Sequence, residues 1–289
     1  MKKNKLSVLQ NVKKSDVQNH PFPLVIAKDA LNQTVYEELY RSYPTDRLIV
    51  ENDYNNAVAF ENAEQNTRYQ ISAKQIHEGK LELPTIWQEF VEYHTSQEFL
   101  NEVLDLFGES IVHHYPNMSQ KVLNKDYRAG VRRYSDAPED CDLALDCQPG
   151  INTPLTSISK VLGPHLDNSV ELYAGLLYFR DPQDKSFGGD LVVNGWTIPS
   201  PKFYGKSRVR ANHVEEIKRV SYAPNTLVMF VNTINSVHEV TMRHPTTYSR
   251  KLVNIIGEVY PVIPNGLFSP IKKRPSFNPF RLARMFIKS

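Results

Sequence analysis

The sequence lacks any hydrophobic run long enough to cross a membrane. Its longest apolar stretches cover only residues 172–179 and 227–231, far short of the roughly 18 residues that a spanning helix needs. The chain begins with Met-Lys-Lys-Asn-Lys, but polar residues interrupt the segment 6–17 that follows, so the apolar core of a secretory signal is missing. We therefore expect a cytoplasmic protein.

Cysteine and excess charge are also scarce. The two cysteines, Cys141 and Cys147, have the spacing of neither a CxxC redox pair nor a zinc knuckle, and we expect free thiols in a reducing compartment. Lysine and arginine together number 34 against 32 acidic residues, which gives a net charge of +2. Such a balance gives no reason to expect a nucleic-acid partner.

Basic residues do concentrate near the C-terminus. Residues 271–289 contain six lysines and arginines and no acidic residue. Aromatic and aliphatic side chains lie among the basic ones, a pattern typical of a basic amphipathic helix. We expect this tail, residues 266–289, either to contact a membrane surface or a protein partner, or to dock on its own protein.

Apolar segments and turn residues predict helices in the first part of the chain and strands in the second. In residues 1–120 we expect a poorly ordered start over 1–20, a strand at 21–26, loops or short elements over 45–80, and helices from Asp29 to Tyr43, after Pro84 and from Ser96 to Gly108. In residues 121–265 we expect strands at 121–123, 130–133, 143–148, 172–179, 190–193, 226–231, 237–242 and 251–260. Many strands without long helices favour a sandwich or barrel. The helical region packs on it as part of one body, because no flexible linker separates the two.

Three residues of the strand-rich part can bind one metal ion together. Within a strand, His165 and Asp167 point to the same face. His238 lies 71 residues beyond Asp167, after an apolar strand, and can supply a third ligand. Two histidines and one carboxylate on one face of a metal form the ligand set of non-heme Fe(II) oxygenases. Zinc hydrolases use similar ligands, but they favour tetrahedral closure with one water.

An arginine follows at a spacing that suits the same site. Arg250, Leu252 and Asn254 alternate onto one face of the last predicted strand. The planar guanidinium of Arg250 matches a carboxylate and keeps its charge at any physiological pH. The sequence therefore places a carboxylate-binding group near the candidate metal ligands.

With these residues in order, the sequence resembles the Fe(II)- and 2-oxoglutarate-dependent oxygenases, nearest their prolyl-4-hydroxylase-like branch. The resemblance covers residues 122–262, with a Pro-Phe-Pro lead-in at 21–23, and its motifs are His165-x-Asp167, Leu176-Leu177-Tyr178-Phe179, Gly188-Gly189-Asp190-Leu191, His238 and Arg250. It implies an all-β core with added helices, in which residues 121–265 form a double-stranded β-helix (a jelly roll like that of cupins). The N-terminal helices of residues 1–120 would pack on this barrel.

The resemblance also implies roles for individual residues. His165, Asp167 and His238 would hold Fe(II). Arg250 and Tyr178 would bind the distal carboxylate of 2-oxoglutarate. Leu191, which follows the Gly188–Gly189 turn, would lie under the cosubstrate. Gln148 or Asn152, on the strand before the metal ligands, would contact its inner end, and Asn254 would line the pocket beside Arg250.

The implied reaction is hydroxylation of an unactivated carbon, with 2-oxoglutarate and O2 as cosubstrates and ascorbate as an auxiliary reductant. A carboxylate at Asp167 favours hydroxylation, because related halogenases have a small residue there. The substrate would be a protein side chain of the prolyl type or a small anionic metabolite. The long segment 194–223 carries several basic residues over 202–219. It is either a lid that attracts an anion or a solvated hairpin.

Two alternatives come from other classes of protein. The barrel could be a cupin-like protein that binds a metal without turnover, although a bare structural metal needs no carboxylate clamp such as Arg250 with Tyr178. It could also be a metal-dependent hydrolase or isomerase. The identity of the metal and a dependence on O2 would separate this class from an oxygenase.

Overall fold

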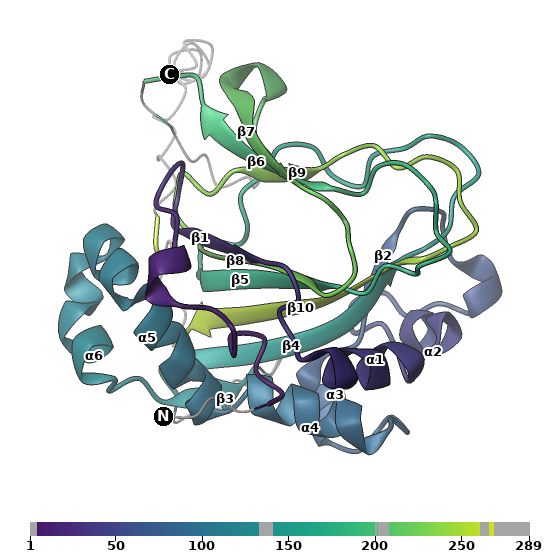
Figure 1. Cartoon of the computed structure of the whole chain (residues 1–289), viewed down its shortest axis with the longest axis horizontal. Helices are drawn as coiled ribbons and strands as arrows, with labels where there is room; N and C mark the ends of the chain where they lie inside the picture. The colour runs from purple at the N-terminus through teal and green to yellow at the C-terminus, as the bar shows by residue number, and fades with distance from the viewer. Residues whose placement is uncertain (1–4, 133–140, 200, 202–207, 261–265, 269–289) are drawn as a thin grey trace, which may run out of the picture.

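Two β-sheets lie one above the other, and most of their strands come from the second half of the chain (Figure 1). The structure is a computed structural model that describes residues 5–132, 141–199, 201, 208–260 and 266–268. The larger sheet has the order β1–β8–β5–β10–β4–β2, with β3 beside β4. Its strands are β1 (Leu24–Ala27), β2 (Arg68–Gln70), β3 (Ala129–Val131), β4 (Leu143–Asn152), β5 (Glu171–Tyr178), β8 (Thr226–Val231) and β10 (Arg250–Val259). Neighbouring strands are antiparallel except for β3 and β4.

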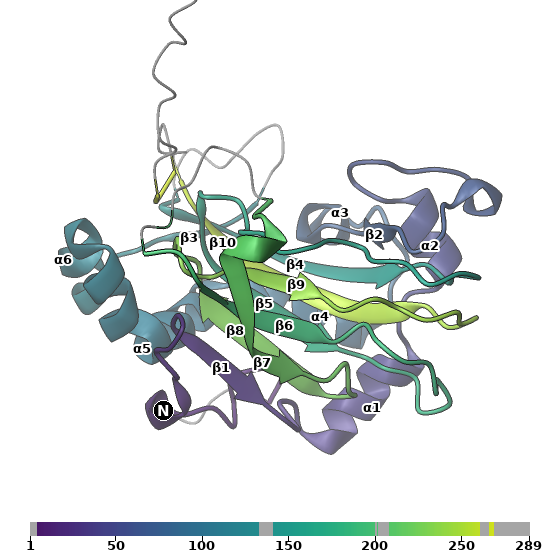
Figure 2. The same ribbon diagram turned by 90° about the horizontal axis from the view of Figure 1, so that it is seen from above.

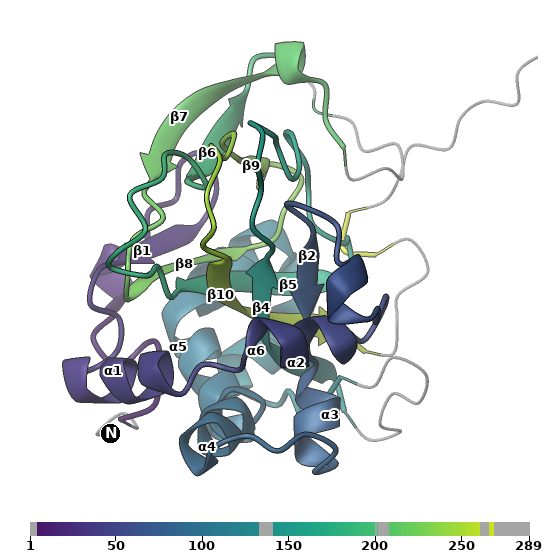
Figure 3. The same cartoon turned by 90° about the vertical axis from the view of Figure 1, so that its right-hand side faces the viewer.

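The smaller sheet has the order β7–β6–β9. Its antiparallel strands are β6 (Leu191–Trp196), β7 (Val214–Val220) and β9 (His238–Val240). Figure 3 shows this sheet stacked over the larger one, and Figure 2 views it from above. Residues from both sheets line a cavity of about 400 Å³, so that side chains from distant strands can meet around one ligand.

Helices cover the outer face of the larger sheet, on the side away from the smaller sheet (Figure 1). They are α1 (Gln33–Arg41), α2 (Asp46–Glu51), α3 (Ala73–His77), α4 (Thr85–His94), α5 (Gln97–His114) and α6 (Ser119–Asn124), with 3₁₀ turns η1 (Lys14–Asp16), η2 (Phe60–Asn62), η3 (Pro116–Met118) and η4 (Ala211–His213). At the N-terminus of a helix, a polar N-cap side chain accepts a hydrogen bond from a backbone N–H that has no partner within the helix. Asn32 does so for α1 and Ser96 for α5.

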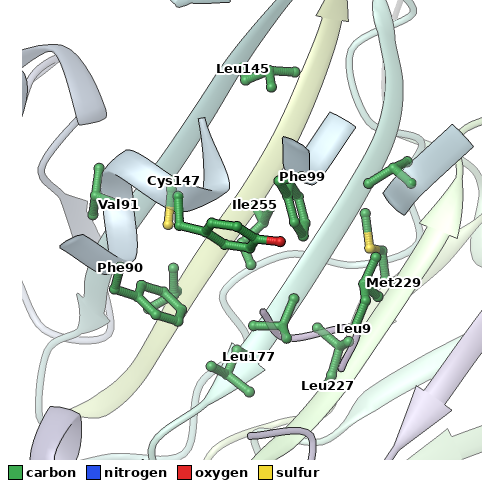
Figure 4. Close-up of a cluster of buried hydrophobic side chains, with 14 of the residues drawn as sticks. Leu9, Phe90, Val91, Phe99, Leu145, Cys147, Leu177, Leu227, Met229 and Ile255 are labelled. Carbon is green, nitrogen blue, oxygen red and sulfur yellow. The ribbon is translucent and has the colours of Figure 1, made fainter. Parts of the chain in front are cut away.

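The main hydrophobic core fills the space between the larger sheet and these helices. Figure 4 shows its buried side chains from the strands and from the helices, among them Leu145, Cys147, Leu177, Leu227, Met229, Ile255, Phe90, Val91 and Phe99. Burial of each large apolar side chain contributes roughly 1.5–3 kcal/mol. Successive strand residues point to opposite faces. Gln148 and Asn254, the neighbours of Cys147 and Ile255, therefore face the cavity.

The structure confirms seven of the eight strands predicted after residue 120, and the strand at 21–26 is present as β1. The predicted strand at 121–123 is wrong, because these residues belong to α6. Gly108 also fails to end α5, which continues to His114. Gly108 is a buried residue in the interior of α5, and a Cβ atom there would make only an ordinary van der Waals contact with Val122 at 3.4 Å.

Two further expectations for the N-terminal region are wrong. Asp29 does not cap α1, since it has a φ of 51° and Asn32 takes that role. Residues 45–80 do contain short elements between loops, namely α2, α3 and β2, and the two helices are capped by Thr45 and Ser72. The expected disorder of residues 1–20 does not hold for the described residues from 5 onward, where the buried apolar side chains are Leu6, Val8, Leu9 and Val12.

The helical and strand-rich regions share one hydrophobic core, and the first 120 residues supply two strands of the larger sheet, β1 and β2. Cys141 and Cys147 are buried and form no disulfide with each other. Within the described residues, no helix has the length and apolar character that crossing a membrane requires. Residues 202–207 of the basic segment and 269–289 of the tail lie outside the described residues.

Candidate metal centre and adjoining cavity

The two histidines of the predicted metal site are brought together by direct backbone pairing. The His165 amide donates to the His238 carbonyl at 2.9 Å, and the His238 amide donates to the His165 carbonyl at 3.0 Å. Residues paired in this way project their side chains to the same side, and the two imidazole centroids are 4.3 Å apart. The predicted strand at His165 is reduced to isolated bridges. Its alternation persists, since Leu166 packs with Val237 away from the histidines.

Asp167 completes the cluster. Its Oδ1 atom lies 3.9 Å from His165 Nε2 and 3.6 Å from His238 Nε2. The three ligand atoms all lie within 4.8 Å of one another, and they form the one such group found among the described residues. The structure therefore brings His165, Asp167 and His238 together beside the cavity.

Both imidazoles are oriented for metal binding by the backbone. Nδ1 of His165 contacts the Gly163 carbonyl and Nδ1 of His238 contacts the Ser236 carbonyl, each at 2.9 Å. A carbonyl oxygen only accepts, so each Nδ1 carries the proton and each Nε2 keeps its lone pair. Burial, together with the nearby His238 ring, lowers the pKa of His165 to about 4. A neutral His165 with a free Nε2 suits a divalent metal.

Arg250 is held firmly at the start of β10. Its Nε donates to the Gly189 carbonyl at 2.8 Å, and its Nη1 donates to Asn152 Oδ1 at 3.3 Å. The guanidinium carbon lies 4.9 Å from the ring centroid of Tyr178 and 5.0 Å from that of Tyr222. Cation–π contacts of this kind favour the charged guanidinium, which lies against both aromatic rings at the cavity wall.

Polar atoms around this guanidinium are buried without partners. Among the described residues, Arg250 Nη2, Asn152 Nδ2 and the Tyr178 hydroxyl make no hydrogen bond. A buried donor that lacks a partner costs about 1–3 kcal/mol, and such groups are rare unless a ligand or water satisfies them. Three unsatisfied groups that can donate, one of them cationic, fit a carboxylate better than any neutral group.

The glycine pair in front of Arg250 permits this arrangement. Gly188 and Gly189 have φ values of 85° and 80°, a region that other residues rarely adopt. At Gly188, an added Cβ atom would lie only 1.7 Å from the Met242 carbonyl oxygen. At Gly189, it would lie 3.3 Å from Arg250 Cδ. The tight turn predicted from the sequence is therefore present, and it leads directly into β6.

The other predicted site residues also lie at or beside the cavity. Leu191 lines it and packs with Tyr178 and Leu252. Asn254 and Gln148 line it as register partners on β10 and β4, and Asn254 Nδ2 donates to Gln148 Oε1 at 3.0 Å. Gln148 Nε2 in turn donates to Asp146 at 2.7 Å. These two amides satisfy each other, whereas the Asn152 amide nitrogen remains unpaired.

Sequence reasoning missed several residues of the site. Tyr222, the second ring against Arg250, follows the basic segment and belongs to no motif of the resemblance. Arg68, Gln70 and Glu171 also line the cavity. Arg68 and Gln70 lie on the three-residue strand β2, in a region for which the sequence predicted only loops or short elements of unspecified type. Burial, together with the charge of Asp167, raises the pKa of Glu171 well above its usual range.

The sequence matches no protein-family model and no curated protein sequence. Solved structures with a similar fold include a prolyl 4-hydroxylase of Phytophthora capsici (14% identity, TM-score 0.45, 99% of this chain and 74% of that chain). They also include a prolyl-4-hydroxylase of Pseudomonas putida (12% identity, TM-score 0.43, 82% of this chain and 92% of that chain). A third is the dioxygenase for auxin oxidation 1 of Arabidopsis thaliana in a 2-oxoglutarate complex (10% identity, TM-score 0.44, 86% of each chain). At these values the similarity assigns no role to any residue, so the site is interpreted from its own geometry.

Proposed function

We propose that this protein is an Fe(II)- and 2-oxoglutarate-dependent dioxygenase that hydroxylates an unactivated C–H bond. The substrate would be a protein side chain of the prolyl type or a small anionic molecule. In this proposal the two stacked sheets are the two halves of a double-stranded β-helix. The reducing cytoplasm is the compartment in which two free cysteines and an Fe(II) site would both persist.

One observation carries the proposal, namely that two complementary sets of unsatisfied groups adjoin the same cavity. The first is the metal-binding set of two imidazole Nε2 atoms and one carboxylate, which matches the facial ligand set of non-heme Fe(II) sites. The second is the set of buried unpaired groups around Arg250, which matches a carboxylate. A dicarboxylic keto acid that chelates the metal at one end and meets Arg250 at the other satisfies both sets.

The residues of the chain then have separate tasks. His165, Asp167 and His238 would hold the metal and leave its other positions open. Arg250 and Tyr178 would fix the far carboxylate of 2-oxoglutarate, and Leu191 would exclude water from that end of the cavity. When bound, Fe(II) with 2-oxoglutarate and O2 supplies the oxidation of the C–H bond, while 2-oxoglutarate is converted to succinate and CO2. The protein's contribution is placement of the reacting groups.

The test is anaerobic addition of Fe(II) and 2-oxoglutarate to the metal-free protein. We expect the visible metal-to-ligand charge-transfer band of the chelate in the wild type and no band in His165→Ala. An Asn11→Ala variant, changed at an exposed residue, serves as the control and should keep the band.

Two outcomes would redirect the proposal. Binding of Fe(II) without the band would reject 2-oxoglutarate as cosubstrate and favour a cupin-like metal-binding protein. Binding of Zn(II) with hydrolytic turnover in the absence of O2 would favour a hydrolase. A band that survives in His165→Ala would remove this residue from the ligand set.

A further inference from the structure

A second arginine lines the cavity and has no hydrogen-bond or ion-pair partner among the described residues. Arg68 of β2 is the register neighbour of Asn152 on β4, which is in turn the register neighbour of Arg250 on β10. Register neighbours project to the same face of a sheet, and all three side chains line the cavity. Arg68 therefore shares a wall with Arg250, two strands away from it.

The other two arginines of the cavity wall are already engaged. Arg132 forms an ion pair with Glu258 at 2.7 Å and lies 3.8 Å from Asp146. Arg250 is fixed by its own contacts and by the two tyrosine rings. By contrast, the Arg68 side chain makes no hydrogen bond or ion pair with any residue that the structure describes. The Arg68 guanidinium is exposed to solvent and lines the cavity, so it is available to bind a ligand.

The surroundings of Arg68 suit an organic anion of low charge. Arg250 lies on the same wall, and the two positive charges repel each other. A guanidinium stays charged at neutral pH, and a bound anion would relieve this repulsion. Asp167 lines the same cavity, and its negative charge opposes a multiply charged anion. Beside Arg68, Gln70 Oε1 is buried without a donor among the described residues and can accept a bond from a ligand N–H or O–H.

The size of the cavity limits what can bind there. A volume of about 400 Å³ lies near the lower end of ordinary ligand pockets, and in the proposed function 2-oxoglutarate occupies part of it. The remaining space suits a small molecule.

We propose that Arg68 binds the carboxylate of a small organic substrate and thereby positions a C–H bond of that substrate toward the metal. The planar guanidinium matches a carboxylate through two parallel hydrogen bonds. This inference rests on the proposed function and narrows its substrate to a small carboxylic or amino acid.

The experiment uses full-length protein loaded anaerobically with Fe(II) and 2-oxoglutarate. L-leucine, L-proline and hexanoate are titrated, each beside its carboxamide, and their binding is followed by perturbation of the charge-transfer band. We expect at least one carboxylate to bind more tightly than its carboxamide. Arg68→Met should weaken that carboxylate ~10- to 100-fold, as expected for loss of a hydrogen bond to a charged group. Arg68→Lys should restore part of the affinity, because the charge returns without the planar fork.

Arg41→Met is the matched control, because Arg41 is exposed on α1 and pairs with Glu37. It makes the same change of charge without altering the cavity, and binding should stay as in the wild type. A failure of every carboxylate to perturb the wild-type band would overturn the inference, and so would equal affinities in wild type and Arg68→Met. Loss of the band itself in Arg68→Met would assign Arg68 to the cosubstrate and also overturn it. Absence of the band in the wild type is a different failure, which rejects the proposed function and the substrate assignment with it.

Discussion

At the scale of single residues, the side chain of Arg250 is held in one position by several contacts. Two hydrogen bonds and two aromatic rings fix its guanidinium, yet Nη2 has no hydrogen-bond partner among the residues that the structure describes. Because the guanidinium is already held in place before the ligand binds, the entropy cost of binding is smaller.

We therefore predict that Arg250→Met weakens 2-oxoglutarate binding by ~2–5 kcal/mol, the range found when a buried charge pair loses one partner. The measurement is an anaerobic titration of the charge-transfer band, with Fe(II) binding determined separately. Arg250→Lys should recover only part of the loss, because an ammonium cannot reproduce the planar fork. Arg219→Met, at an exposed ion pair on β7, is the matched control. An unchanged affinity in Arg250→Met would place the carboxylate clamp elsewhere.

The sequence predicted the metal cluster and Arg250 because each belongs to a motif with characteristic spacing. The position of Asp167 relative to His165 follows from alternation along an extended chain, which survives even though the expected strand is only a bridge. Arg68 had no comparable signal. It lies on a strand of three residues, and only the pairing of β2 with β4 brings it to the site. Pairing between distant segments has no local sequence pattern.

At the scale of secondary-structure elements, a buried histidine joins the N-terminal segment to α4. His94 Nδ1 contacts the Phe90 carbonyl at 2.7 Å, and the Val8 amide donates to His94 Nε2 at 3.2 Å. Phe90 and Phe99 surround the ring. This arrangement requires the neutral imidazole, because a protonated Nε2 could not accept the bond from Val8.

Burial lowers the pKa of His94 to about 3, whereas an unfolded histidine titrates near 6.5. Between these values the unfolded state binds a proton that the folded state does not, so the free energy of unfolding falls as the pH falls. We predict a contribution of ~1.4 kcal/mol per pH unit below about pH 6. Urea unfolding of the metal-free protein at several pH values measures it.

His94→Gln is the comparison for that experiment, because glutamine can accept from Val8 but does not titrate. Its stability at neutral pH should be lower, since the ring contacts are lost, but its dependence on pH should be weaker than in the wild type. His165 contributes with the same sign in both proteins, so the difference between them isolates His94. Identical slopes would contradict the assignment.

Elements with strong periodicity were predictable, and short capped ones were not. β8 and β10 are runs of apolar or alternating residues, and their predicted and observed bounds nearly coincide. α2 and α3 have six and five residues, too few for a helical pattern to emerge. Gly108 was misread because glycine is typical of helix ends, whereas this one lies in the interior of α5.

At the scale of the whole molecule, the metal and cosubstrate would connect the two sheets. Asp167 and His165 lie on a loop, His238 begins β9, and Arg250 begins β10, so one chelate would link segments far apart in sequence. A ligand that binds only the folded state stabilises it by about 2.7 kcal/mol at 100 times its dissociation constant.

We predict that Mn(II) with 2-oxoglutarate raises the Tm of the metal-free protein by ~5–10 °C under such saturation, given about 2–4 °C per kcal/mol for a chain of this size class. Differential scanning calorimetry measures the shift. It should largely disappear in His238→Ala and be reduced in Arg250→Met. A Tm that does not change when the ligands are added would contradict a site that spans both sheets.

The outer strand of the smaller sheet, β7, bears on whether copies of the protein associate through their sheet edges. Residues 215–219 of β7 are all exposed, and among the described strands β7 pairs only with β6. An open edge of this kind can recruit another chain into a continuous sheet. The charges of β7 balance, with Glu215 and Glu216 against Lys218 and Arg219, and such side chains hinder edge-to-edge aggregation. We therefore expect the described end of the basic segment to disfavour self-association through the sheet that carries His238.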